Sequence, residues 1–340
     1  MFRGKKNFLL THHFSTFVYT QASKFQLLIF YFKEFIEFMK TKFVQLFSIA
    51  LIFSAVFFAF TKIRLHAQTA DVKTYLNISY AKREGFAPNL TNLDIYAPSN
   101  AKKAPVMIMI HGGGWQIGDK SNRGVWTNKV PFFAENGFIF VNINYRLSPA
   151  IQHPEHIRDV AEAVAWVYNN IAQYGGDRDQ IFVMGHSAGA HLAALVATDD
   201  RRLKEFGKDL SIIKGVILLD GAGYDVPTQM KSVEAIIGLT IKMYSTAFTN
   251  DGNIQKDASP FYHIAKGKNI PPFLLFTAGR RFSSQNQSEK MAKAIVEAGS
   301  NAEVINDPTK NHGSINQDFG LPNEMITKKA QEFLDGILKK

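Results

Sequence analysis

Residues 181–198 read IFVMGHSAGAHLAALVAT, and this stretch decides the fold that the sequence predicts. Its first four residues form an apolar run typical of a buried strand, and residues 188–198 have a helical pattern. Gly185 and Gly189 are small enough for a tight turn between the two, which lifts the Ser187 side chain above the sheet. We therefore interpret Ser187 as a nucleophile; the alternative is an ordinary serine in a glycine-rich turn.

Apolar runs of the same kind alternate with amphipathic helical windows from residue 68 onward. The predicted strands span residues 92–96, 106–110, 138–142, 181–184, 216–219, 273–276 and 302–305, and the predicted helices about 123–136, 156–173, 188–198, 284–298 and 323–338. This alternation is typical of an α/β fold with a mostly parallel sheet and helices on both faces. The connection 225–269 is long for a compact domain, and we expect a small cap over the active site there.

A glycine-rich loop follows the strand predicted at 106–110 and reads His111-Gly112-Gly113-Gly114-Trp115. No side chain shields the amides of consecutive glycines, so this loop can donate hydrogen bonds to an oxygen that becomes negative during acyl transfer. Together with the amide of Ala188 it would form an oxyanion hole. A flexible turn is the alternative, whereas the missing Gly-Lys-Ser/Thr argues against a nucleotide-phosphate loop.

The general base is expected on the loop after the last predicted strand, where His312 follows Asn306-Asp307-Pro308-Thr309-Lys310-Asn311. Loops that follow parallel strands meet at one edge of the sheet, so this loop and the serine turn should lie together. We expect the other histidines of residues 68–340 that compete for this role to be structural or exposed to solvent: His153, His156, His186, His191 and His263.

Five stretches in order resemble the α/β-hydrolase superfamily, in the esterase and lipase branch of hormone-sensitive lipase and secreted carboxylesterases. They are LDIYAP at 93–98, HGGGW at 111–115, NYRLSP at 144–149, GHSAG at 185–189 and the His312 loop. The resemblance covers about residues 75–340 and implies an α/β-hydrolase fold. It also maps the oxyanion donors to the amides of Gly113, Gly114 and Ala188.

The third catalytic residue is where the sequence departs from that family. The family usually places an acid after the strand matching 273–276, but the loop here reads TAGRRFSSQ, with arginine where Asp is expected. We predict that Asp220, at the end of the preceding strand, takes this place, as in some lipases of the superfamily. A turn-capping role for Asp220 is the alternative, and Asp225 and Asp307 are the other candidates.

Residues 1–67 differ in composition from residues 68–340. They hold nine of the 39 Lys and Arg, only two acidic residues, and 15 of the 29 phenylalanines. Much of the net charge of +10 therefore belongs to this leader, which weakens a nucleic-acid-binding interpretation. The remaining 68–340 shows no linker or repeat, so we predict a single domain with the cap at about 225–269.

The leader has the pattern of an export signal. The uncharged stretch FVQLFSIALIFSAVFFAF at 43–60 follows Lys40 and Lys42, and Ala67 offers a small residue for cleavage. We expect a signal peptide at about 39–67 and an exported, periplasmic or secreted, protein. An uncleaved membrane anchor is the alternative. Because MKTKF begins at Met39, residues 1–38 are expected to come from an upstream start; the rival is a membrane-surface segment at 25–38.

These observations predict a serine hydrolase that cleaves carboxylic esters through an acyl-enzyme on Ser187, supported by His312 and Asp220. The expected partner is a small-molecule or polymer-derived ester rather than nucleic acid, with membrane contact only through an uncleaved leader. No cofactor or metal ion is expected, since no His/Asp/Glu cluster has metal-ligand spacing and cysteine is absent. The alternatives are an amide or peptide substrate, acetyl or feruloyl side groups of polysaccharides, and a non-catalytic ligand-binding protein on a hydrolase scaffold.

Overall fold

The computed structural model describes residues 32–40, 42–43, 71–232 and 240–339. The chain divides into two compact units, residues 1–68 and 69–340. In the first unit, residues 32–40 and 42–43 are helical and exposed; the rest of the predicted signal peptide 39–67, and most of residues 1–38, lie outside the described residues. Among the helices that the structure describes, none has the length and apolar character needed to cross a bilayer.

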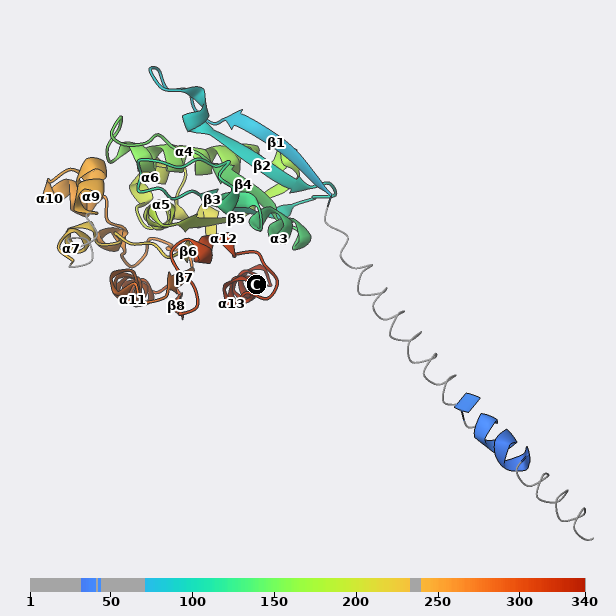
Figure 1. The fold of residues 1–340 in the computed structure, drawn as a ribbon. Coiled ribbons are helices and arrows are strands. Elements are labelled where there is room, and N and C mark those ends of the chain that lie inside the picture. The colour runs from blue at the N-terminus through green and yellow to red at the C-terminus, as the bar shows by residue number, and fades with distance from the viewer. Residues whose placement is uncertain (1–31, 41, 44–70, 233–239, 340) are drawn as a thin grey trace, which may run out of the picture. The chain divides into compact units, whose positions relative to one another are not determined.

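The second unit is built on one sheet in the strand order β1-β2-β4-β3-β5-β6-β7-β8 (Figure 1). Strands β3 to β8 pair in parallel, whereas β2 is antiparallel to both β1 and β4. The strands are β1 (Val72–Ser79), β2 (Asn92–Pro98), β3 (Ala104–Ile110), β4 (Ile139–Ile143), β5 (Gly176–His186), β6 (Ile213–Leu219), β7 (Phe273–Ala278) and β8 (Ala302–Asp307). The predicted mostly parallel α/β sheet is confirmed, and β1 was missed.

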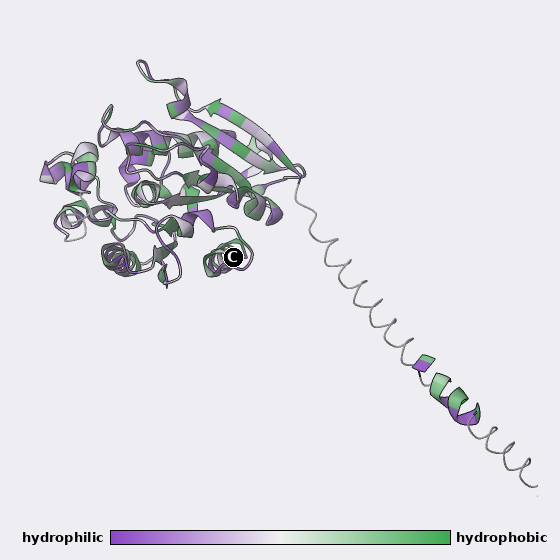
Figure 2. Cartoon of the chain, viewed as in Figure 1, coloured by the Kyte–Doolittle hydropathy of each residue, from purple (hydrophilic) through white to green (hydrophobic). Residues whose placement is uncertain are grey.

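Helices cover both faces of this sheet, and the alternation of side chains along each strand supplies both cores. Ile108 of β3 joins the core beneath α4 (Glu155–Asn170) and α5 (Ala188–Val196). The next residue, Met109, joins the core beneath α3 (Lys129–Glu135) and α13 (Met325–Leu338). The outer helices α11 (Phe282–Glu297) and α13 carry hydrophobic and hydrophilic residues on different sides (Figure 2).

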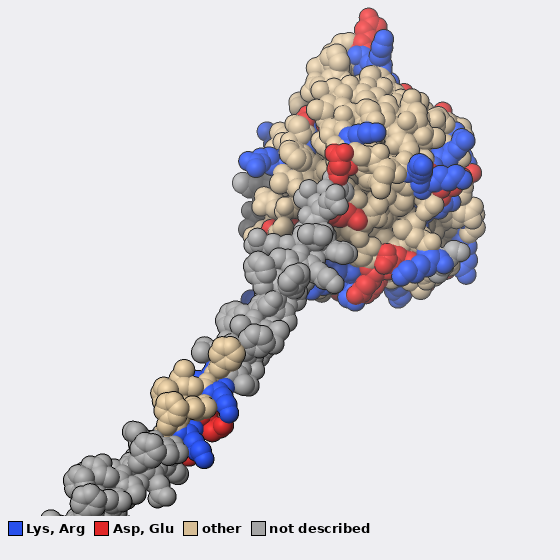
Figure 3. Space-filling model, turned by 90° about the vertical axis from the view of Figure 1, so that its right-hand side faces the viewer, with Lys and Arg blue, Asp and Glu red and all other residues tan. Residues whose placement is uncertain are grey.

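Most predicted elements occur within a few residues of their expected bounds. The window 123–136 is two helices, α2 (Arg123–Trp126) and α3, and the window 156–173 is α4 followed by the 3-10 turn η2 (Ile171–Tyr174). Short elements complete the unit: η1 (Pro88–Thr91), α6 (Asp200–Lys204), η3 (Leu210–Ile212) and α12 (Ser314–Gln317). Both acidic and basic side chains lie on the face of the second unit in Figure 3.

The long connection after β6 forms a separate group of short helices (Figure 1). It contains α7 (Val226–Met230), α9 (Ile241–Phe248), α10 (Gly252–Asp257) and the turn η4 (Pro260–His263), and residues 233–239 within it lie outside the described part. The amide of His153 donates to Ala247 O at 2.9 Å, and Arg202 Nη2 lies 2.6 Å from Asp257 Oδ2. These contacts fix the connection to the body of the unit, next to the pocket described below.

Candidate active site

Ser187 lies on a strained turn between β5 and α5. Its backbone has φ 56° and ψ −121°, a region that non-glycine residues rarely occupy. The Ser187 amide donates to Leu219 O of the neighbouring strand at 3.0 Å. A Cβ on Gly185 would lie 2.2 Å from Gly189 O, and one on Gly189 would lie 2.1 Å from Ile110 O. Both glycines of the motif are therefore required for the close approach of strand and helix that holds the turn.

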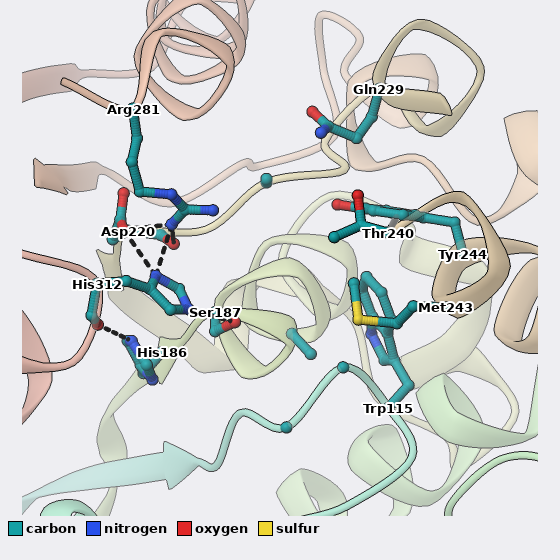
Figure 4. Close-up of a pocket in the computed structure, with 14 residues that line it drawn as sticks. Trp115, His186, Ser187, Asp220, Gln229, Thr240, Met243, Tyr244, Arg281 and His312 are labelled. Atoms are coloured by element: carbon teal, nitrogen blue, oxygen red, sulfur yellow. Dashed lines mark hydrogen bonds and ion pairs between the residues drawn. The ribbon is translucent and has the colours of Figure 1, made fainter. Parts of the chain in front are cut away.

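The structure brings Ser187, His312 and Asp220 into one chain of hydrogen bonds (Figure 4). Ser187 Oγ lies 3.0 Å from His312 Nε2, and His312 Nδ1 lies 2.7 Å from Asp220 Oδ2. The three residues follow β5, β8 and β6, so the ends of three parallel strands supply them. In this geometry Nδ1–H donates to the carboxylate and Nε2 accepts the serine proton, the arrangement that activates a hydroxyl.

The Asp220 carboxylate is completely buried and fully partnered. Its Oδ1 accepts from Ser284 Oγ at 2.8 Å and from the Ala278 amide at 3.3 Å. Its Oδ2 accepts from both His312 and Arg281. Burial alone would raise the pKa of Asp220, but the His312 hydrogen bond and the Arg281 charge outweigh it and lower the pKa to about 2. Asp220 is therefore a carboxylate at neutral pH.

Arg281 lies where the family resemblance expects an acid, on the loop after β7. Its Nη1 donates to the Asp220 carboxylate and to Asp220 O at 3.3 Å, and it also contacts His312 Nδ1. Both nitrogens converge on the same carboxylate oxygen. The carboxylate beside His312 thus comes from the end of β6, and Arg281, on the loop after β7, is its ion-pair partner.

The loop that carries His312 is anchored on both sides. Half-buried His186 donates from Nε2 to His312 O at 2.7 Å, and desolvation of its ring lowers the pKa of His186 to about 3, so the ring is neutral. Lys129 donates to Asn316 O four residues later, and Lys310 Nζ lies 2.8 Å from Asp318. These contacts hold the imidazole in position without touching its ring nitrogens.

The predicted oxyanion donors line the same pocket as Ser187. Within the described chain, the amides of Gly113, Gly114 and Ala188 donate no hydrogen bond, so all three are available to a ligand. Gly113 has φ +118° and Gly114 has φ +61°, conformations that L side chains rarely adopt. A Cβ on Gly113 would lie 1.9 Å from Ile117 O, so only glycine fits there.

Two neighbouring features support the glycine loop. The Trp115 ring is buried against Tyr244 and Phe248 of α9, with ring centroids 5.1 and 4.6 Å away. The His111 ring stacks on Tyr145 at 4.5 Å, and Tyr145 Oη donates to His111 O at 3.1 Å. The NYRLSP segment therefore acts as a support for the loop beside the nucleophile.

A pocket of about 600 Å³ opens above the serine (Figure 4). Its lining residues are Gly113, Gly114, Trp115, His186, Ser187, Ala188, Asp220, Ala222, Gln229, Thr240, Met243, Tyr244, Arg281 and His312. The wall facing the serine comes from the connection 225–269, through Gln229, Thr240, Met243 and Tyr244. The sequence predicted a cap in the same segment, but no motif could identify the individual side chains of this wall.

The other candidate acids and histidines have different partners. Asp225 caps α7 and pairs with Lys290 Nζ at 2.7 Å, and Asp307 accepts from Thr309. His191 donates to Ala258 O and His156 bonds Ser148, both buried, and burial lowers the pKa of each to about 3. His153 and His263 lie against Asp257. Among the residues that the structure describes, no three His, Asp or Glu side chains gather as a metal site would require.

Comparison with known proteins gives the chain several relatives. A protein-family model described as BD-FAE matches residues 93–295. Esterase LipQ of Mycobacterium tuberculosis is 30% identical over 241 residues, 69% of this chain and 56% of the relative. Probable carboxylic ester hydrolase LipM of the same organism is 36% identical over 177 residues, 51% of this chain and 40% of the relative. The chain spans about half the length of the curated relatives it matches.

Solved structures share the fold. The crystal structure of esterase B from Lactobacillus rhamnosis has a TM-score of 0.64 at 22% identity, covering 85% of this chain and 95% of that one. A truncated carbohydrate esterase from gut microbiota has a TM-score of 0.64 at 21% identity, covering 81% and 99%. These likenesses confirm the hydrolase fold predicted from the sequence.

Proposed function

The chain belongs to the BD-FAE family, and from this premise we propose that it is a serine hydrolase that cleaves carboxylic esters through an acyl-enzyme on Ser187. The observation that carries the proposal is the continuous hydrogen-bonded path from Ser187 Oγ through His312 to the buried Asp220 carboxylate. This path ends in a pocket lined by Gly113, Gly114 and Ala188, whose amides donate no hydrogen bond within the described chain. The named esterases among the relatives support the same chemistry.

In the proposed first step, Ser187 Oγ attacks the ester carbonyl while His312 Nε2 takes the hydroxyl proton. The carbonyl oxygen becomes negative and accepts hydrogen bonds from the amides of Gly113, Gly114 and Ala188. His312 then gives its proton to the leaving alcohol, and the acyl group stays on Ser187. Water repeats the sequence in reverse order and releases the acid. Asp220 holds Nδ1–H of His312 and stabilises the imidazolium in both steps.

One of the alternatives loses support at this site. The non-catalytic interpretation rested on the acid missing after β7, and Asp220 occupies the corresponding position beside His312. An amide or peptide substrate remains an alternative, because the same serine, histidine and backbone donors also serve amide hydrolysis. The acetyl and feruloyl esters of polysaccharides remain a subclass of the proposed substrates, with no pocket feature that selects them.

A fluorophosphonate probe tests the proposal, because such probes label only an activated serine. The wild-type protein should be labelled and should hydrolyse 4-nitrophenyl butyrate with an initial burst of nitrophenol. Ser187→Ala should lose both labelling and turnover while its thermal unfolding stays near that of the wild type. Unchanged hydrolysis by Ser187→Ala would refute the assignment.

We also propose that the protein is exported, to the periplasm or beyond the cell. The support is the basic, then apolar, then small-residue pattern before Gln68, together with the unit boundary at residues 68 and 69. N-terminal sequencing of the exported protein should start near Gln68, and a peptide from residues 1–38 would contradict a start at Met39. Retention of the leader in the membrane fraction would instead support an anchor.

A further inference from the structure

The guanidinium of Arg281 is the charged group that a bound substrate meets. Its side chain is 35% exposed and lines the pocket, whereas its ion-pair partner Asp220 is 0% exposed. The Asp220 carboxylate is thus buried, whereas the Arg281 guanidinium is accessible from the pocket. In the described part of the chain, Asp220 is also the one carboxylate among the pocket-lining residues.

Only one corner of the guanidinium is engaged. Within the described residues, every hydrogen bond of its side chain uses Nη1, which contacts Asp220 O, Asp220 Oδ2 and His312 Nδ1. Arginine carries five N–H donors in a planar fork, so Nε and Nη2 keep donors for a ligand. In Figure 4 the second nitrogen of the group points away from Asp220 and toward the cavity. The hydrogen bonds of Nη1 fix the plane of the guanidinium, so the Arg281 side chain loses little conformational entropy when a carboxylate binds.

The distance of Arg281 from the reacting atoms determines how far from the ester bond a substrate's anion must lie to bind it. Its Nη1 contacts His312 Nδ1, and the opposite nitrogen of that ring bonds Ser187 Oγ. One imidazole ring therefore separates the cation from the serine, a span that a short carbon chain between an ester and a carboxylate would bridge. The facing wall contains Trp115, Met243 and Tyr244, so it offers apolar contact to the rest of the substrate.

Building on the proposed esterase function, we propose that Arg281 is a specificity-determining residue that selects esters carrying a carboxylate, or a similar anion, near the ester bond. A second negative charge would ordinarily oppose formation of the oxyanion beside Ser187. The guanidinium offsets this repulsion and binds the extra anion through the donors that Asp220 leaves unused. The preferred substrates are thus half-esters of short dicarboxylic acids or esters of acidic alcohols.

The test compares kcat/KM for pairs of esters of similar size, one member anionic and the other neutral. On the acyl side the pair is the 4-nitrophenyl half-ester of glutaric acid and 4-nitrophenyl valerate; on the alcohol side it is 4-acetoxybenzoate and its methyl ester. We expect the wild type to favour the anionic member of at least one pair. Arg281→Gln should reduce that preference about tenfold to a hundredfold, as expected for a hydrogen bond to a charged group. The pair that responds identifies which side of the ester carries the anion.

The matched control is Arg280→Gln, which removes the same charge from the neighbouring, exposed arginine outside the pocket. It should leave the anionic-to-neutral ratio at the wild-type value, so a change in both variants would indicate a general charge effect and overturn the proposal. An unchanged ratio in Arg281→Gln would overturn it as well. If Arg281→Gln unfolds, a second experiment measures how strongly free glutarate inhibits the wild type and Arg281→Lys. An anion site would be refuted if glutarate inhibits both proteins equally, and no more strongly than neutral glutaramide does. If the wild type is not labelled by the fluorophosphonate probe, the esterase function itself is refuted instead.

Discussion

Replacing Asp220 by asparagine tests the role of the acid most directly, because the neighbouring donors fix which way the new amide lies. The Ala278 amide and Ser284 Oγ both donate to Oδ1, so the amide oxygen of the new side chain would take that place. Its NH2 group would then face His312 Nδ1 and Arg281, where two donors already point. His312 can respond only by presenting an unprotonated Nδ1, which leaves the proton on Nε2, facing Ser187.

A base protonated on the wrong nitrogen cannot accept the serine proton. Losing the correct protonation of His312 should lower kcat roughly 10⁴-fold, which is about 5 kcal/mol of transition-state stabilisation. The assay is steady-state hydrolysis of 4-nitrophenyl butyrate by Asp220→Asn, with the rate of fluorophosphonate labelling as a second readout. Circular dichroism must show a folded variant, because the substitution leaves Arg281 without its carboxylate.

Asp225→Asn is the matched control for this experiment. It removes a carboxylate that is also nearly buried and paired, but with Lys290 and far from His312 in the hydrogen-bond network. Its kcat should stay within a few-fold of the wild type. A greater loss in Asp225→Asn than in Asp220→Asn, with both variants folded, would refute the assignment of the acid.

Two further predictions concern the glycine loop and the response to acid. Gly114→Ala should lower kcat on the order of 10² to 10³, because the residue needs φ +61° and its Cβ would lie 2.4 Å from Met243 Sδ, displacing an oxyanion donor. The control Gly252→Ala has open space around its Cβ and should leave esterase kinetics unchanged. Equal effects in the two variants would argue against the role of the glycine loop. The pKa of Asp220, lowered from its ordinary value of 3.8 to about 2, adds stability that is present above about pH 4 and is lost as the pH falls toward 2, about 2 kcal/mol in all. Unfolding free energies measured by urea titration from pH 5 to pH 2 should show this loss in the wild type and a smaller one in Asp220→Asn; parallel curves would contradict it.

The sequence alone could predict the parts of the site that are set by backbone conformation. GHSAG and HGGGW need glycine for steric reasons, because a Cβ on Gly189 or Gly113 would overlap a backbone oxygen. A strand end also places Asp220 by topology, whichever side chains surround it. These requirements leave a fixed pattern of glycines in the sequence, so they can be predicted without knowing which backbone atom makes the close contact.

Other features depend on contacts between distant segments and were not predicted. Strand β1 is mostly exposed, so it lacks the continuous apolar run that identified its neighbours. The departure at Arg281 was visible, but its pairing with Asp220 requires the ends of β6 and β7 to meet. Likewise, Met243 and Tyr244 become pocket residues only because α9 packs on Trp115.

The hydrogen bond from the Ser187 amide to Leu219 O joins the nucleophile to the residue directly before Asp220. The peptide unit that receives this bond continues into the acid, whose own amide donates to Phe276 O at 2.8 Å. Serine and carboxylate are consequently both tied to the sheet by backbone hydrogen bonds, whereas His312 lies on the loop after β8. The alignment of the imidazole with Ser187 and Asp220 therefore depends on the contacts that His186 and Lys129 make with the His312 loop.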